Sequence, residues 1–144
     1  MVRIDEKTLS VNEAWKGSRY KSDAYKAYRT KLLYLLPRKI DMPEPPFVIY
    51  FRFGFSSAAS DWDNPVKPLQ DILAEKYGFN DKLIRRAVVD TEIVPKGQEF
   101  FEFELRSFVA KYRPVLTENR KRVWFDGTLP PTVNPVTIVN PKNK

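Results

Sequence analysis

Residues 47–73 read FVIYFRFGFSSAASDWDNPVKPLQDIL and contain a strand, a polar loop and the beginning of a helix. Apolar residues at every second position predict a strand over Phe47–Phe55 with one strongly apolar face. The helical part carries apolar residues at three- and four-residue intervals: Val66, Leu69, Ile72, Leu73 and Tyr77. Gly78 is a typical residue just past a helix end. The stretch therefore predicts a sheet strand that leads through a short loop into a helix covering that sheet.

Elements are predicted on both sides of this stretch. Ser22–Leu36 has the periodicity of an amphipathic helix, with Ser22 as its N-cap and Pro37 directly after it. Short apolar alternations predict strands at Val2–Ile4, Leu83–Val94 and Phe101–Arg106. The last two strands are predicted to form an antiparallel hairpin.

The chain changes character after Phe108, where five prolines interrupt polar and β-branched residues and no compact element is predicted. We therefore expect one domain over residues 1–108 and a proline-rich C-terminal extension over 109–144. That extension is interpreted as an arm on a partner subunit, a DNA-contacting tail or weakly ordered sequence. The fold class predicted for the domain is α+β, with a small mixed or antiparallel sheet packed against helices.

Composition restricts the chemistry. The 144 residues include no histidine and no cysteine, which excludes imidazole-based hydrolases and thiolate or imidazole metal sites. Carboxylates, lysines and a metal ion remain as candidate reagents. No apolar run is long enough to span a membrane and no signal-type segment is recognised, so a soluble, cytoplasmic protein is expected.

The net charge of +7 is concentrated near the N-terminus. In the first forty residues ten lysines and arginines stand against four acids, an excess of six. Candidate DNA-contacting side chains are Lys16, Arg19, Lys21, Lys26 and Arg29. Such a segment favours a polyanionic partner, most simply nucleic acid, although an ordinary solvated basic surface is the alternative. Trp15 and Tyr20 stack on exposed bases in one interpretation and fill a core gap in the other.

Two carboxylates, Asp61 and Asp63, stand at positions i and i+2 directly before the predicted helix. If the backbone is extended there, their side chains point the same way and can share one cation. Asn64 is predicted as a helix cap. Lys67 and Asp71 lie four residues apart and share a helix face, so an ion pair between them is expected.

The pattern Asp61-x-Asp63-Asn64-x-x-Lys67-x-x-x-Asp71-x-Leu73, followed by Gly78-Phe79-Asn80-Asp81-x-x-Ile84, resembles the RusA family of Holliday-junction resolvases, which are common in phages and prophages. The resemblance runs roughly from Ser10 to Ser107. It implies a RusA-like fold, a homodimer and a structure-selective endodeoxyribonuclease that cuts branched DNA in recombination and repair, in the cytoplasm of a bacterial or phage-infected cell.

The resemblance also assigns roles to residues. It implies that Asp61, Asp63 and Asp81 hold Mg²⁺, with Mn²⁺ as a substitute, and that Lys67 is the catalytic lysine. Asn64 and Asp71 match family positions and are support residues, with Asp71 either a further ligand or the partner of Lys67. Asn80 stands where the family often has a second acid, which leaves the number of metal ions open. No small-molecule cofactor and no membrane partner are expected.

The predicted helix separates Asp81 from the other two acids. A straight helix over residues 64–77 would separate its ends by roughly 20 Å. Asp81 can therefore join the other two acids only if the following loop doubles back, the helix is short or a second subunit supplies it. Two other function classes fit the same residues. One is a basic DNA-binding protein without catalysis, in which Asp61 and Asp63 are helix caps. The other is a glycosyltransferase that holds a metal ion and a nucleotide-sugar through Asp61-Trp62-Asp63, which the short chain and the lack of a nucleotide-binding βαβ unit disfavour.

Overall fold

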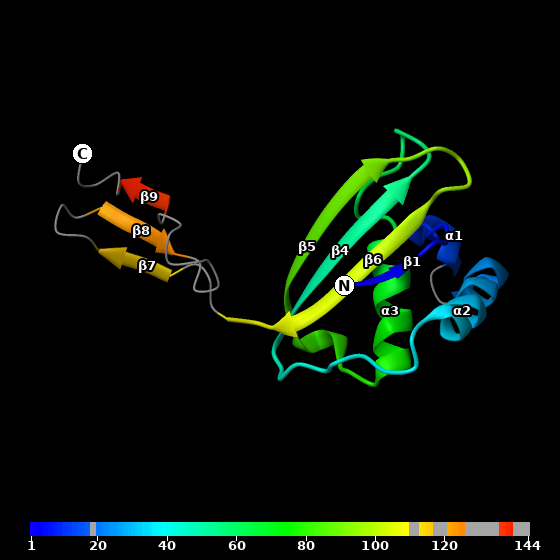
Figure 1. The fold of residues 1–144 in the computed structure, drawn as a ribbon, viewed down its shortest axis with the longest axis horizontal. Coiled ribbons are helices and arrows are strands. Elements are labelled where there is room, and N and C mark those ends of the chain that lie inside the picture. Colours follow the sequence, from blue (N-terminus) through cyan, green and yellow to red (C-terminus); the bar gives the residue numbers. More distant parts are fainter. Residues whose placement is uncertain (18–19, 110–112, 117–120, 126–135, 140–144) are drawn as a thin grey trace. The chain divides into compact units, whose positions relative to one another are not determined.

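The computed structural model describes residues 1–17, 20–109, 113–116, 121–125 and 136–139 (Figure 1). The chain divides into two compact units, Met1–Phe108 and Val109–Lys144. The second unit contains three antiparallel strands in the order β7 (Arg113–Leu116), β8 (Lys121–Phe125) and β9 (Val136–Val139). The sequence-based expectation of no compact element here is therefore wrong. The β-branched residues between the prolines form ladders, and Pro114 lies inside the edge strand β7, a position that tolerates proline.

The first unit is an α+β fold built on a four-stranded mixed sheet in the order β1-β6-β4-β5. Its strands are β1 (Val2–Ile4), β4 (Phe47–Phe55), β5 (Ile84–Ile93) and β6 (Phe100–Ser107). The central strand β4 pairs in parallel with β5 and antiparallel with β6. The parallel pair follows from the connection, because helix α3 (Val66–Tyr77) carries the chain back to the starting end of the sheet before β5 begins.

The predicted hairpin between the second and third long strands is wrong. Strands β5 and β6 lie on opposite sides of β4, and the Val94 N–H continues the β5 pairing by donating to the Phe55 carbonyl at 2.8 Å. A turn around Pro95–Gly97 predicts that the chain reverses, but it does not determine which strand the following segment pairs with. Pairing with β4 instead brings Phe103 opposite Phe51 and so joins two apolar faces.

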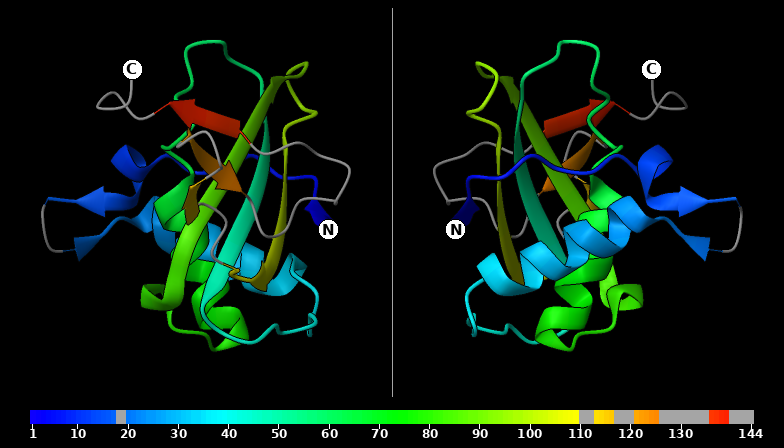
Figure 2. Two further views of the ribbon diagram at one scale, coloured as in Figure 1. Left: turned by 90° about the vertical axis from the view of Figure 1, so that its left-hand side faces the viewer. Right: turned by 90° about the vertical axis from the view of Figure 1, so that its right-hand side faces the viewer.

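The helices gather on one face of this sheet (Figures 1 and 2). In chain order they are α1 (Val11–Ala14), α2 (Asp23–Leu35), α3 and the 3₁₀ turn η1 (Asp81–Leu83). A short hairpin, β2 (Trp15–Lys16) and β3 (Tyr20–Lys21), joins α1 to α2 and projects away from the rest of the unit (Figure 2). The predicted N-cap of α2 is confirmed, because the Tyr25 N–H donates to the Ser22 hydroxyl at 3.1 Å.

The core lies between the helices and the alternate residues of β4. Phe51, Phe53 and Phe55 stack in sequence at ring-centroid distances of 5.4 and 5.8 Å. The helices contribute the buried side chains Tyr25, Tyr28, Leu32, Leu69, Ile72 and Leu73. Leu35, expected on the apolar face of α2, is 40% exposed, because the buried face of the helix runs through Leu32 to Leu36, which is 3% exposed.

The opposite face of the sheet is organised around the Phe100 ring. The Arg3 guanidinium lies 3.9 Å from the centre of this ring, and Arg52 lies 5.4 Å from it. A Cβ atom on Gly54 would approach carbons of the Phe100 ring to 2.4 Å, so glycine is required where the two strands meet. The contact lies at the C-terminal end of β4, just before the loop that carries Asp61.

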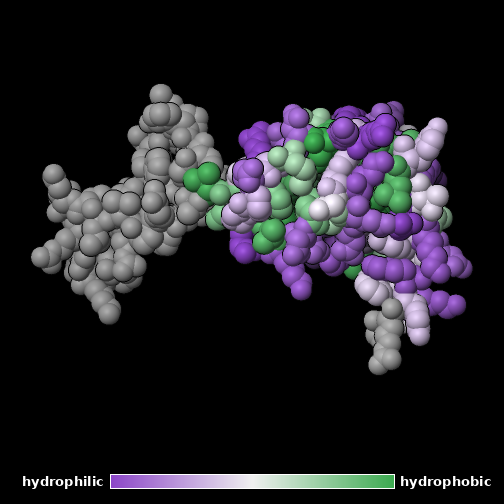
Figure 3. All heavy atoms as spheres, turned by 90° about the horizontal axis from the view of Figure 1, so that it is seen from below, coloured by the Kyte–Doolittle hydropathy of each residue, from purple (hydrophilic) through white to green (hydrophobic). Residues whose placement is uncertain are grey.

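The view from below in Figure 3 shows hydrophilic residues over most of the coloured surface, with hydrophobic residues in small separate areas. In the part of the chain that the structure describes, no helix has the length and apolar character needed to cross a membrane.

Candidate functional site

The candidate site is built around the first turns of α3. The helix begins at Val66 with Pro65 as its N-cap, and no side chain caps it. The prediction that Asn64 is the cap is therefore wrong, as is the alternative in which Asp61 and Asp63 cap the helix. Pro65 takes the N-cap position, and Asn64 instead ties the N-terminal segment to the helix start, because its carbonyl accepts from the Val11 N–H at 2.7 Å.

The segment from Asp61 to Asp63 is a series of turns and not extended chain. The Asn64 N–H bonds to the Asp61 carbonyl at 3.3 Å, and the Val66 N–H bonds to the Asp63 carbonyl at 3.0 Å. The two carboxylates are therefore not aligned by an extended backbone as predicted, since Pro65 and the helix start impose turn geometry. Both residues are exposed, and within the described residues neither side chain makes a hydrogen bond or ion pair.

Lys67 is the centre of an ionic cluster. Its ammonium lies 2.7 Å from Asp71 Oδ1, the expected i, i+4 pair, and 3.3 Å from Asp81 Oδ2. The Gln70 amide also donates to Asp81 Oδ2, at 3.3 Å. The Lys67 side chain is 52% exposed, so a solvent-borne ligand can reach its ammonium.

The cluster shifts the pKa values of Lys67 and Asp81. The hydrogen bond to Asp71 is the main cause that raises the pKa of Lys67, with a further contribution from Asp81, against the opposing effect of partial burial. Hydrogen bonds from Lys67 and then Gln70 lower the pKa of Asp81. Lys67 is therefore cationic and Asp81 anionic throughout the neutral range.

The loop after α3 doubles back, which is one of the three alternatives given above for the position of Asp81. Gly78 adopts the left-handed conformation with φ 69° and ends the helix, and Asn80 caps η1 by accepting from the Lys82 N–H at 3.0 Å. Asp81 consequently lies beside Lys67 and Gln70 of the same chain. A short loop of the same chain brings this acid to the start of α3.

The three acids predicted to hold a metal ion do not lie in one group. Asp81 pairs with Lys67, whereas Asp61 and Asp63 lie in the turns just before α3. Among the described residues no three acidic side chains gather closely enough to form a metal-binding group. The structure thus brings together Lys67, Asp71 and Asp81 and leaves Asp61 and Asp63 as two exposed carboxylates beside them in sequence.

Lys21 connects the β2–β3 hairpin to this cluster. Its ammonium lies 3.8 Å from the centre of the Trp15 ring and 4.3 Å from that of Tyr25, and it pairs with Asp71 Oδ2 at 3.4 Å. The Asp71 carboxylate therefore accepts from two lysines, Lys67 at Oδ1 and Lys21 at Oδ2. Trp15 is 38% exposed and Tyr20 is 72% exposed, so neither fills a core gap.

The other basic residues differ in whether an acidic side chain already pairs with them. Lys16 and Lys26 are exposed and, in the described part of the chain, have no ion-pair partner. Arg29 forms a two-bond ion pair with Glu75 of α3, with one bond at 2.8 Å, and the pairing lowers the pKa of Glu75. Arg19 lies outside the described residues.

Two features were missed in the sequence. The first is α1, whose capping box joins the Ser10 hydroxyl and the Glu13 carboxylate to each other's backbone, and the Ser10-x-x-Glu13 spacing was an available signal. The second is a cavity of about 390 Å³ next to Asp61, which combines segments far apart in the chain and has no local signature.

Comparison of the sequence with models of known families and with curated proteins finds no match.

Proposed function

We propose that the protein is a magnesium-dependent, structure-selective endodeoxyribonuclease of the RusA type that resolves four-way DNA junctions by cutting paired strands. The observation that carries the proposal is the environment of Lys67. Its ammonium is held by Asp71 and Asp81 at the start of α3, directly after the Asp61–Asp63 turn. A fixed cation, with two unpaired carboxylates a few residues earlier in the chain, supplies the kinds of group that metal-assisted hydrolysis of a phosphodiester uses.

Lys67 supplies the positive charge in this proposal. The half-exposed ammonium, with its raised pKa, stays protonated and stabilises negative charge on the phosphate or on the leaving oxygen. Two carboxylates from different elements restrict its position, so little reorganisation is needed when the substrate arrives.

Asp61 and Asp63 suit Mg²⁺ by their chemistry, because the ion prefers hard oxygen ligands and both carboxylates are exposed without protein partners among the described residues. Asp81 has one oxygen engaged by Lys67 and Gln70 and could offer the other, Oδ1. When bound, the ion would activate water and offset charge on the phosphate, and Mn²⁺ would serve in its place.

The charge distribution supports a DNA substrate. Lys16 and Lys26 are exposed and unpaired in the described structure, in a chain with a net charge of +7. A homodimer fits this substrate, since a four-way junction has approximate two-fold symmetry and two copies offer equivalent sites to opposed strands. Such an enzyme would act in the cytoplasm of a bacterial or phage-infected cell.

The test compares a labelled four-way junction with a linear duplex of the same sequence, in Mg²⁺ and in EDTA. Wild-type protein is expected to nick the junction only in Mg²⁺, and Asp63→Asn is expected to keep binding and lose cleavage. Asp41→Asn removes an exposed acid from the α2–β4 connection and is the matched control. Full activity of Asp63→Asn would remove the proposed catalytic centre. Binding by wild type without nicks in either buffer would favour the alternative, a non-catalytic basic DNA-binding protein of the same fold.

A further inference from the structure

Strand β5 is the outer strand on one side of the four-stranded sheet (Figure 1). It is the longest strand of that sheet, with ten residues, and none of its side chains is buried. The outer strand on the other side, β1, has only three residues. Along its outer edge, β5 has no strand partner among the described residues, and a row of backbone N–H and C=O groups of this kind can pair with another chain.

The register of β5 on β4 determines which backbone groups face outward. The Val94 N–H donates to the Phe55 carbonyl of β4 at 2.8 Å, and the pairing with β4 is regular from Arg86 to Ile93. Because backbone groups alternate in direction along a strand, the even-numbered residues bond to β4 and the odd-numbered residues face away from it. The outward residues are Ala87, Val89, Thr91 and Ile93.

This outer edge lacks the usual protection against pairing. Proteins commonly protect outer strands with proline, lysine or other charged residues. None of the four outward residues is charged or a proline, and the charges within the regular part of β5 lie at the alternate positions. Ala87 and Thr91 are exposed, and Ile93 is 62% exposed. The edge is therefore open to a second strand.

The charges of β5 make the strand complementary to itself. Arg86 lies near its beginning, and Asp90 and Glu92 lie near its end. If two copies pair antiparallel with Val89 opposite Val89, Arg86 comes opposite the partner's Glu92 and diagonal to the partner's Asp90. A guanidinium has five donors, so a contact of Arg86 within its own chain leaves others for the partner. A register centred on Asp90 would instead place like charges opposite each other.

We propose that the outer edge of β5 binds a second copy of this chain and that the two sheets join into one continuous sheet of eight strands, with the two-fold axis at Val89. The inference rests on the proposed function only for the use of the dimer, since the edge argument involves no catalysis. Opposite residues of antiparallel strands project to the same face. The helices of both copies, and both Lys67 clusters, would therefore lie on one face of the joined sheet.

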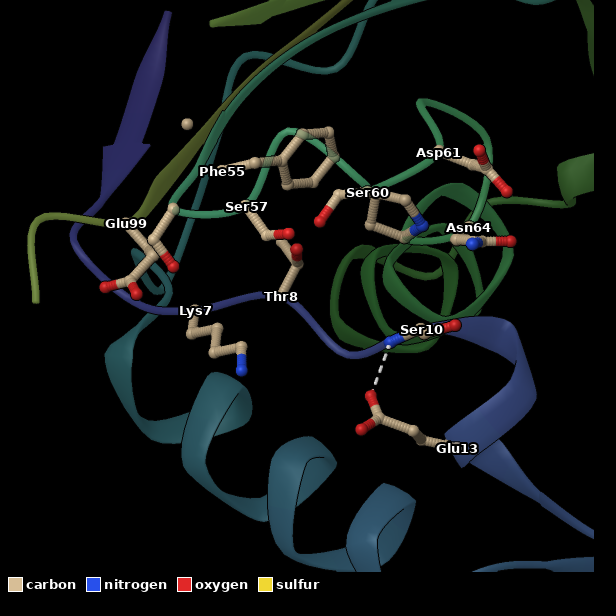
Figure 4. Close-up of a pocket in the computed structure, with 13 residues that line it drawn as sticks. Lys7, Thr8, Ser10, Glu13, Phe55, Ser57, Ser60, Asp61, Asn64 and Glu99 are labelled. Carbon is tan, nitrogen blue, oxygen red and sulfur yellow. Dashed lines mark hydrogen bonds between the residues drawn. The ribbon is translucent and has the colours of Figure 1, made fainter. Parts of the chain in front are cut away.

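The interface strand is connected to the candidate site and leaves it open. Asp81 lies in η1, which runs directly into β5 at Ile84. The cavity next to Asp61 (Figure 4) is lined by no residue of β5, so pairing along β5 does not close it. A single isologous interface would thus present two equivalent sites to two opposed strands of a four-way junction.

The test measures self-association of the full-length protein, without DNA, by sedimentation equilibrium over a range of concentrations. Wild type is expected to reach twice the mass of one chain. Thr91→Pro removes an outward N–H and should weaken dimerisation roughly ten- to a hundred-fold, because each dimer loses two hydrogen bonds. The fold should persist, since this N–H does not face β4. Thr91→Val keeps the N–H and is the matched control, which should dimerise like wild type.

A charge variant keeps the test valid if Thr91→Pro does not fold. Asp90→Lys would face the partner's Arg86 and should also weaken the dimer, whereas Asp41→Lys makes the same charge change on the α2–β4 connection and should not. In wild type, hydrogen exchange of Ile84–Ile93 should slow as protein concentration rises. Mg²⁺-dependent junction cleavage is measured with the same samples.

The outcomes separate this inference from the proposed function. A monomeric wild type, or a dimer that persists in folded Thr91→Pro or in Asp90→Lys, overturns the inference and leaves the proposed nuclease standing. A dimer that responds to the variants as expected but neither binds nor cuts the junction supports the interface and overturns the proposed function alone.

Discussion

The Lys67 ammonium lies 3.3 Å from Asp81 Oδ2, although the two residues are fourteen positions apart and the helix α3 separates them. The relationship exists because the chain turns back after Gly78 and lays η1 against the helix. Asp71 holds the same ammonium from within α3, at 2.7 Å. A lysine fixed by acids from two elements has a defined position, and its removal should affect chemistry more than folding.

Replacement of Lys67 by Met is expected to lower the single-turnover cleavage rate of a four-way junction by roughly 10²–10³-fold, because a preorganised positive charge is lost. Stability should change by less than about 1 kcal/mol, since the ion pairs are half-exposed. Urea titration and gel-based kinetics measure the two effects. Lys96→Met, outside the site, should match wild type in both, and an active Lys67→Met would rule out the proposed role.

Asp71→Asn should move the alkaline limit of activity to lower pH. The hydrogen bond to Asp71 is the largest cause of the raised pKa of Lys67, and activity that needs the protonated amine declines as pH rises through that pKa. A weaker acceptor lowers the pKa and brings the decline earlier. Single-turnover rates from neutral pH to about pH 10.5 would show the shift, and an unchanged profile would contradict the assignment. Asp41→Asn, an exposed acid on the α2–β4 connection, is the control.

Basic residues without an ion-pair partner should contribute more to DNA binding than those already paired with an acid. Lys16→Gln and Lys26→Gln are each expected to reduce the slope of log affinity against log salt by about one, as one phosphate contact is lost. Arg29→Gln should change the slope less, because Glu75 already pairs with this guanidinium. A larger effect for Arg29 than for both lysines would show that the pair with Glu75 opens on binding.

Gly54→Ala is expected to destabilise the fold by about 1–3 kcal/mol through overpacking, since its Cβ would meet the Phe100 ring at 2.4 Å. Phe100→Leu should relieve part of the clash, so the double variant should lose less stability than the two single variants together. Chemical denaturation provides the measurement. Strictly additive losses would show that the strand pair adjusts without involving Phe100.

Tyr77 should titrate late, because burial raises its pKa to about 12. Its hydroxyl donates to the Pro37 carbonyl at 2.8 Å, and Tyr77→Phe should cost about 1 kcal/mol. The unfolded phenol ionises near pH 10, so the contribution of Tyr77 to stability is complete below that pH and is lost as pH rises toward 12. Ultraviolet titration and stability at alkaline pH, compared with Tyr77→Phe, test both statements.

Local signals in the sequence predicted those parts of the fold that depend on near neighbours. Ser22 predicted the start of α2, the alternation over Phe47–Phe55 predicted β4, and Gly78 predicted the end of α3. The pairing of β5 could not be predicted in this way, because it depends on the crossover through α3 and on which edge of β4 is free.

The same division applies to the candidate site. Helical spacing predicted the Lys67–Asp71 pair, since i and i+4 share a face. The contacts of Lys67 with Asp81 and of Lys21 with Asp71 depend on how separate elements meet, so no spacing rule predicts them. The conformation of Asp61 and Asp63 was mispredicted because Pro65 and the helix start override an extended backbone.

Strand β4 is hydrogen-bonded to a neighbour along both of its edges. Amide protons in a central strand exchange with solvent only when the sheet itself opens, so Phe47–Phe55 should be among the slowest-exchanging segments of the first unit. The loop that carries Asp61 begins where this strand ends. The turn that carries Asp61 and Asp63 is therefore attached, at its N-terminal end, to a strand whose amide protons are expected to exchange slowly.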